Sequence, residues 1–161
     1  SKSASVGETQ IALKLMEYAE SGMGFEEICD KADQFRDSVK TYFVLDNLST
    51  FIKNGRIKGI KAAVATTLSI KPILTGVDGT IEQIAQAIGI KKALSQMVNI
   101  IHEHHLNNES RQIIISQCNC SERAERMGEQ LSDITDAPVM ILPTRGVSTT
   151  YANDGGIIVT I

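Results

Sequence analysis

The sequence has few cysteines, little net charge and no long apolar run. Its three cysteines are an odd number, and Cys118 and Cys120 are separated by a single residue, so they do not form a disulfide framework. We interpret all three as reduced thiols, and a reducing cytoplasm is the expected location. The formal net charge of −3 over 161 residues gives no general electrostatic reason to bind nucleic acid.

Other missing features exclude further classes of protein. The longest apolar runs, at 112–116 and 139–142, are far too short for a membrane span, and no basic-then-apolar signal segment is present. The sequence contains no Walker loop, dinucleotide fingerprint or nucleophile elbow, and no carboxylate pair spaced for acid–base catalysis. We therefore expect no cofactor. The hydrophobic content of 42% and the charged content of 22% are typical of a soluble globular protein.

Three histidines and a glutamate lie close together near the middle of the chain. They are His102, Glu103, His104 and His105. This run lacks the second histidine that a His-Glu-x-x-His zinc site requires, and no other ligand cluster is placed to help. Charged histidines are favoured in the last turn of a helix by the helix dipole. We therefore predict no metal site and expect His105 to be partly buried against the core.

The first forty residues predict a pair of helices. Ser5 and Glu8 form a capping box at the start of the first helix, which then runs to Gly22. A second helix begins near Phe25 and continues to Val39. A short glycine-containing turn makes these helices antiparallel neighbours. We expect the pair to lie against a sheet, because its apolar stripes must be buried.

The stretch 41–74 organises the rest of the chain. Asp46 and Asn47 offer side-chain oxygens to cap a short helix. Pro72 interrupts the last strand of the stretch, which predicts an edge position or a bulge. The patterns predict a strand at 41–45, a helix at 48–53, a helix at 60–68 and a strand at 69–74.

The remaining residues predict a hairpin followed by alternating helices and strands. Asp78-Gly79 between apolar runs is a hairpin signal, because the turn needs positive φ at both positions. Residues 81–88 fit either a helix face or the second strand of this hairpin, and the turn chemistry favours the strand. Further elements are predicted at 91–106 (helix), 111–116 (strand), 121–133 (helix), 137–142 (strand) and 156–161 (strand). Together they predict an α/β fold with a mixed β-sheet covered by helices.

Six segments occur in an order and at a spacing that characterise one family: SKSASVGET, TYFVLDNL, NGRIKG, LSIKPIL, VDGTIE and GIKKAL. With them the chain resembles the DegV family of bacterial fatty-acid-binding proteins over its whole length. The resemblance implies the carboxy-terminal part of a two-domain fold. Residues 1–40 would then be a helical pair that belongs to, or joins, the missing amino-terminal domain. Residues 41–161 would be the carboxy-terminal α/β domain.

The resemblance also implies a lipid-binding protein that is not an enzyme. Members of the family bury one long-chain fatty acid between two domains and present its carboxylate to a partner fatty acid kinase, which makes an acyl phosphate for phospholipid synthesis. The alternative is an enzyme acting on acyl groups, a hydrolase or a phosphotransferase, whose site is completed by the missing half. Since the family's hydroxyl groups that grip the carboxylate lie in that half, we expect these 161 residues alone to bind fatty acid weakly or not at all.

Two polar residues are candidates for ligand or partner binding. Arg56 lies in a glycine-flanked turn, and its guanidinium suits bidentate recognition of phosphate or carboxylate; the family's arginine in this turn is implicated in work with the kinase. Tyr151 stands near the position of a family histidine close to the carboxylate, and a phenol still donates a hydrogen bond. A solvated turn arginine and a loop tyrosine that packs its ring are the alternatives. Candidates for the lipid-tunnel wall, each equally consistent with plain core, are Phe43, Ile57, Ile60, Val64 and Leu68.

Overall fold

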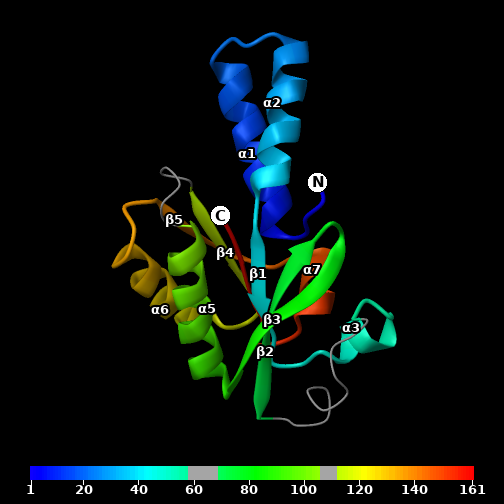
Figure 1. The fold of residues 1–161 in the computed structure, drawn as a ribbon, viewed down its shortest axis with the longest axis vertical. Coiled ribbons are helices and arrows are strands. Elements are labelled where there is room, and N and C mark those ends of the chain that lie inside the picture. The colour runs from blue at the N-terminus through cyan, green and yellow to red at the C-terminus, as the bar shows by residue number, and fades with distance from the viewer. Residues whose placement is uncertain (58–68, 106–111) are drawn as a thin grey trace.

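The computed structural model describes residues 1–57, 69–105 and 112–161, which form a six-stranded mixed sheet with helices around it (Figure 1). The strand order is β3-β2-β1-β6-β4-β5. Only β4 and β5 run parallel, and the other neighbours are antiparallel. The predicted fold class is confirmed. The strands are β1 (Thr41–Val44), β2 (Ile70–Val77), β3 (Thr80–Ile88), β4 (Ile113–Gln117), β5 (Val139–Pro143) and β6 (Ile157–Thr160).

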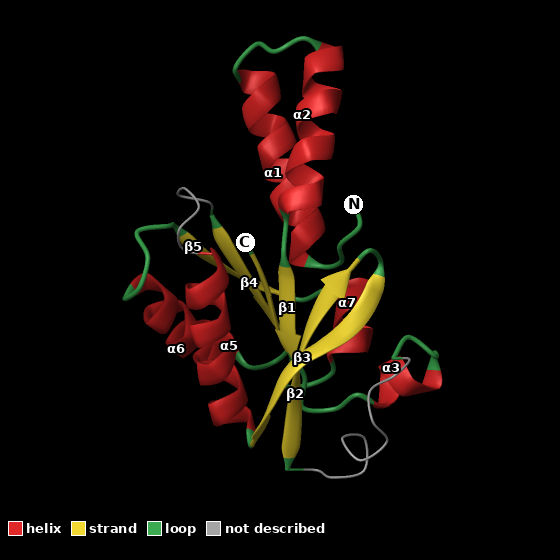
Figure 2. Cartoon of the chain, viewed as in Figure 1, coloured by secondary structure: helices red, strands yellow, loops and turns green. Residues whose placement is uncertain are grey.

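The helices lie on both sides of this sheet (Figure 2). They are α1 (Val6–Glu20), α2 (Phe25–Ser38), α3 (Ser49–Lys53), α5 (Ile90–His105), α6 (Ser121–Ser132) and α7 (Gly146–Ala152). Among them no helix is long and apolar enough to cross a bilayer, a finding that covers only the residues described. The predicted helix at 60–68 lies outside the described residues.

Helices α5 and α6 cover one face of the sheet, because each has an apolar stripe at helical spacing. Met97 and Ile101 of α5 and Met127 of α6 are fully buried, and they pack in one cluster with Val44 of β1 and Ile115 of β4. Leu94, Val98, Ala124 and Leu131 of these two helices are buried in the same cluster. The side chain of His105, which the sequence analysis expects to be partly buried, lies outside the described part of the chain.

Strand β1 is buried on both of its faces, which places it at the centre of the fold. Tyr42 and Val44 face the cluster beneath α5 and α6, whereas Phe43 belongs to a second cluster on the opposite face. Such alternation follows from the two-residue period of a strand. The second cluster includes Leu48 before α3 and Ala152 of α7, so α3 and α7 lie on this opposite face.

Strands β2 and β3 form the predicted hairpin, with positive φ at Asp78 (47°) and Gly79 (77°). The register shifts between Ile73 and Leu74, because β3 has one extra residue, Ile84, opposite them. Ile73 faces the cluster beneath α5 and Leu74 faces the opposite one, as the two-residue period of a strand requires. The bulge predicted at Pro72 thus lies beside it and in the partner strand, while Pro72 itself pairs with Gln86. An edge position is wrong for β2, which lies between β3 and β1.

The helical pair does not lie against the sheet as predicted; it projects away from it (Figure 1). Only the start of α1 is buried, and α2 has no buried residue. Met16 is 57% exposed and Phe25 is 80% exposed. The physical reason is the anchoring of α1 by its first turns, where Gln10 Nε2 donates to the carbonyl of Gln112 (2.8 Å). Beyond that point, within the part of the chain that the structure describes, α1 and α2 pack against each other.

The predicted capping box at Ser5 and Glu8 is also wrong. Ser5 precedes α1 with φ 56° and makes no capping hydrogen bond. Its hydroxyl instead lies 3.1 Å from the hydroxyl of Ser116 in β4. The Ser5 hydroxyl therefore makes a tertiary contact with β4 in place of a capping hydrogen bond to α1. Of the two residues proposed to cap α3, Asn47 does so, because its Oδ1 accepts a hydrogen bond from Ser49 N (2.8 Å).

Candidate functional site

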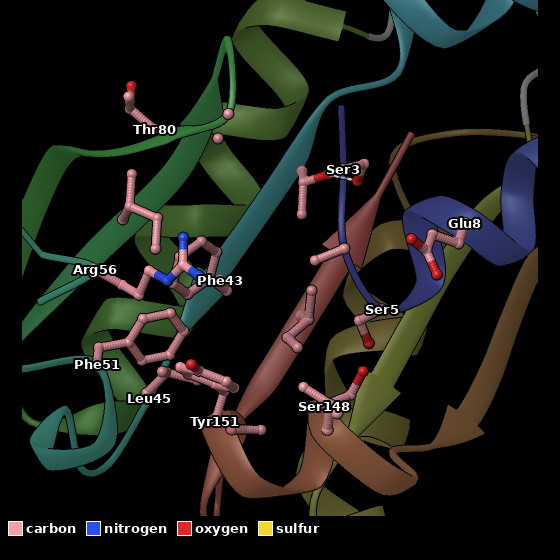
Figure 3. A pocket seen from close by; sticks show the side chains of 18 of the residues that line it. Ser3, Ser5, Glu8, Phe43, Leu45, Phe51, Arg56, Thr80, Ser148 and Tyr151 are labelled. Atoms are coloured by element: carbon pink, nitrogen blue, oxygen red, sulfur yellow. Dashed lines mark hydrogen bonds between the residues drawn. The ribbon is translucent and has the colours of Figure 1, made fainter. Parts of the chain in front are cut away.

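A cavity of about 700 Å³ opens on the sheet face opposite α5 and α6 (Figure 3). Its lining comes from segments that are far apart in the sequence: the amino-terminal residues, β1, α3 with the turn after it, the β2–β3 hairpin, α7 and β6. In Figure 3, Arg56, Phe43, Phe51 and Tyr151 gather on one side, while Ser3, Ser5 and Glu8 lie on the other. The cavity therefore has an aromatic side and a polar side.

The aromatic side is a continuous stack that runs from the sheet to α7. The rings of Phe43 and Phe51 are stacked with centroids 5.9 Å apart. Phe51 then meets the ring of Tyr151 edge-on, with centroids 4.9 Å apart. Leu45 and Ile158 add aliphatic surface beside these rings. Such offset and edge-to-face contacts stabilise an apolar wall beyond simple burial.

Arg56 lies at the edge of this wall, with an exposed side chain. The turn that presents it forms as expected: Gly55 has φ +62°, and the amide of Arg56 donates to the carbonyl of Phe51 (3.0 Å). Asn54 keeps an ordinary negative φ of −91°, so Gly55 alone supplies the left-handed residue that ends α3. The guanidinium is thus available to an anionic group at the cavity.

Tyr151 lies in α7, a seven-residue helix that the sequence patterns do not predict. Its ring is half-buried and lines the cavity, as does the neighbouring Ser148. The side-chain amide of Asn153 donates to the carbonyl of Tyr151 (3.1 Å), which ties the end of α7 to the loop after it. The residue expected to bind a carboxylate therefore adjoins the same cavity as Arg56.

The other candidates divide into three groups. Phe43 lines the cavity. Ile57 is half-buried and packs against the cluster behind the cavity instead of lining it. Ile60, Val64 and Leu68 lie outside the described residues. The structure thus brings Arg56, Tyr151 and Phe43 together, while their roles stay predictions.

The hydroxyl groups on the polar side were missed in the sequence. Ser3 Oγ and Thr41 Oγ1 are 2.7 Å apart and both line the cavity. Ser3 packs so closely on Gly7 that a Cβ at position 7 would overlap Ser3. The available signal was the serine-rich start followed by Gly7, since a glycine often marks a close approach of two backbone segments.

Neither metal ligation nor a thiolate is evident within the described ranges. In residues 1–57, 69–105 and 112–161, no group of three or more His, Cys, Asp or Glu side chains is placed to hold a metal ion. Cys29, Cys118 and Cys120 are free thiols. Burial raises the pKa of Cys120, which favours the protonated, less nucleophilic thiol.

The model of the DegV family, described as "Uncharacterised protein, DegV family", matches residues 1–161. The chain belongs to the DegV family. A DegV domain-containing protein of Streptococcus gordonii is 29% identical over 148 residues, which cover 90% of this chain and 52% of that protein. This DegV chain thus spans about half the length of the curated relatives it matches.

Solved structures of DegV proteins share the fold. A DegV protein from Ruminococcus gnavus, refined with vaccenic acid, is 44% identical with a TM-score of 0.93, over 99% of this chain and 58% of that one. The Fatty Acid Kinase B3 protein of Streptococcus pneumoniae, loaded with linoleic acid, is 25% identical with a TM-score of 0.83. That match covers 93% of this chain and 53% of the other.

Proposed function

We propose that these residues form half of a DegV protein that binds one long-chain fatty acid and presents its carboxylate to a partner fatty acid kinase. The kinase would phosphorylate the carboxylate to an acyl phosphate for phospholipid synthesis. The observation that carries this proposal is that an apolar aromatic wall, the guanidinium of Arg56 and the side chain of Tyr151 line one and the same cavity. Residues 1–40 would belong to the other half or join this half to it.

The apolar wall suits an acyl chain. Ligand pockets are concave and mostly apolar, with a few placed polar groups, and the stack of Phe43, Phe51 and Tyr151 has this character. Burial of an acyl chain contributes ~0.8 kcal/mol per methylene, so the length of the chain supplies most of the affinity. The polar groups of the cavity fix the orientation of the fatty acid. Vaccenic and linoleic acid, which are named for the two neighbouring structures described above, support this ligand class.

The polar groups suit the acid end. We assign to the Tyr151 hydroxyl the role of donating a hydrogen bond to the carboxylate. Tyr151 lies at the end of the aromatic wall, in α7. The exposed guanidinium of Arg56 is assigned to the kinase or to the phosphate being transferred. Binding without catalysis is part of the proposal, and the cytoplasmic location stays a prediction.

Calorimetric titration with oleate and palmitate tests this function in a protein that carries these residues at the full length of the DegV relatives. We expect one fatty acid per protein. Tyr151→Phe removes only the hydroxyl and should weaken binding about tenfold or more, the worth of a hydrogen bond to a charged group. Tyr18→Phe in α1, far from the cavity, is the matched control. Absence of saturable binding to either fatty acid would overturn the proposal.

The kinase step needs a separate measurement. With ATP, a purified bacterial fatty acid kinase and saturating oleate, Arg56→Gln should slow acyl phosphate formation about tenfold, since a bidentate charged contact is lost. An unchanged rate would remove Arg56 from the proposal. Turnover of an acyl phosphate or ester without any kinase would instead favour the alternative, an enzyme acting on acyl groups.

A further inference from the structure

We propose that Arg123 is a positioning residue that holds the two loops of the cavity wall together. The inference rests on the proposed function, because its purpose is to keep the aromatic wall and Arg56 in place for a ligand. Arg123 belongs to α6 and does not line the cavity. It acts through Asp46, in the loop that leads from β1 to α3, and through Gly155, in the loop after α7.

One guanidinium nitrogen of Arg123 contacts both loops. Its Nη1 lies 2.9 Å from Asp46 Oδ2 and also donates a hydrogen bond to the carbonyl of Gly155. The side chains of Arg123 and Asp46 are 26% and 33% exposed, so solvent screens this pair less than a fully exposed one. Charge-assisted hydrogen bonds of this kind are about twice as strong as neutral ones.

The Asp46 side of the link is held by a second cation. Lys71 of β2 lies with Nζ 3.3 Å from Asp46 Oδ1 and donates to the Asp46 carbonyl (2.8 Å). Asp46 therefore connects α6, β2 and the loop that leads to α3. The predicted role of this carboxylate as a helix cap is replaced by a tertiary one.

The Gly155 side is equally constrained. Gly155 N donates to the carbonyl of Cys118 (2.8 Å), and a Cβ at position 155 would overlap Asp46 Oδ2. Asn153 adds a neighbouring tie between the same loops, because its Nδ2 donates to the carbonyl of Asn47 (3.2 Å). The two loops thus meet at a close, polar junction centred on Arg123.

This junction joins the two loops that adjoin α3 and α7, the helices that carry two rings of the aromatic wall. The first loop leads to Phe51 in α3, and the second follows Tyr151 in α7. These two rings meet across the loops with centroids 4.9 Å apart. Since α3 and α7 are short, with five and seven residues, neither is stable by itself. Their relative position depends on tertiary ties such as the Arg123 junction.

Hydrogen exchange of the 161-residue chain tests the junction without any ligand. In Arg123→Gln we expect amides of residues 47–57 and 146–156 to exchange about tenfold faster, because ties that limit local opening are lost. Residues 90–105 should be unchanged. Arg126→Gln is the matched control, because Arg126 lies in the same helix and makes an exposed pair with Glu122.

Further variants separate positioning from a general loss of stability. Asp46→Asn should accelerate exchange in the same two segments, and the effect of the double variant should be smaller than the sum of the two single effects, because the Arg123–Asp46 contact is lost in both single variants. Unchanged exchange in either segment, or equal acceleration in 90–105, would overturn the proposal.

The consequence for the ligand is measured in the full-length protein used for oleate titration. Arg123→Gln should weaken oleate about tenfold with unchanged stoichiometry, and Arg123→Lys should restore part of the loss, since an ammonium keeps the charge but not the planar fork. Full oleate affinity in Arg123→Gln would overturn the positioning role. If the unsubstituted protein binds no fatty acid, the proposed function fails, and the exchange data alone decide whether Arg123 joins the loops.

Discussion

Replacement of Gly155 by alanine should destabilise the protein for two separate reasons. Gly155 has φ +83°, and an L-residue in the left-handed region costs roughly 1–2 kcal/mol. The new Cβ would also lie 2.8 Å from Arg123 Nη1 and overlap Asp46 Oδ2. Because the carboxylate is held by Lys71 as well, it has little freedom to move away without breaking a charged contact.

The cost of the overlap with Asp46 can be separated from the cost of the dihedral by a matched substitution at another glycine. Gly89 has φ +81°, and a Cβ there would meet nothing within 4 Å. Gly89→Ala should therefore cost only the roughly 1–2 kcal/mol of the dihedral. Gly155→Ala should add about 1.5–3 kcal/mol for a lost hydrogen bond to a charged group, which gives about 2.5–5 kcal/mol in total.

Urea denaturation followed by far-ultraviolet circular dichroism measures both variants, a suitable probe because the chain has no tryptophan. The difference between their free energies of unfolding reports the Arg123 junction. Equal losses for Gly155→Ala and Gly89→Ala would refute the reasoning, because the crowding around Asp46 would then cost nothing.

Three further predictions concern other parts of the molecule. Met127→Ala in the core beneath α6 should lower the free energy of unfolding by about 2–5 kcal/mol, and a loss below about 1 kcal/mol would contradict close packing there. Phe25→Ser, at a residue 80% exposed, should change it by less than about 0.5 kcal/mol; a larger loss would mean that this face is covered in solution. Hydrogen bonds from Arg36 and then Lys2 lower the pKa of Asp37 to about 2. The contribution of ionised Asp37 to the free energy of unfolding is therefore fully present above its ordinary pKa of 3.8 and is lost as the pH falls through about 2. An NMR titration of the Asp37 carboxyl should show this midpoint and an upward shift in Lys2→Ala; an unchanged midpoint would exclude that contact.

The sequence determined the elements whose signals are local. Asp78-Gly79 forms the predicted hairpin because both residues adopt positive φ cheaply, and this turn decided correctly between strand and helix for residues 81–88. Helices α5 and α6 follow from apolar stripes with a 3.6-residue period. The resemblance to the family supplied Arg56, within the NGRIKG segment, and Tyr151, near the position of a family histidine, as site candidates; it did not show how these residues meet in space.

Only the tertiary structure decided which partners these elements and side chains took. Ser5 and Glu8 have the spacing of a capping box, yet the Ser5 hydroxyl contacts the hydroxyl of Ser116, more than a hundred residues away. Helix α7 has no periodic signal in its β-branched sequence, and it is held by the burial of Ala152. The junction of Arg123 with Asp46 joins residues 77 positions apart. Contacts between distant residues depend on the path of the whole chain, whereas turns and stripes depend on a few neighbouring residues.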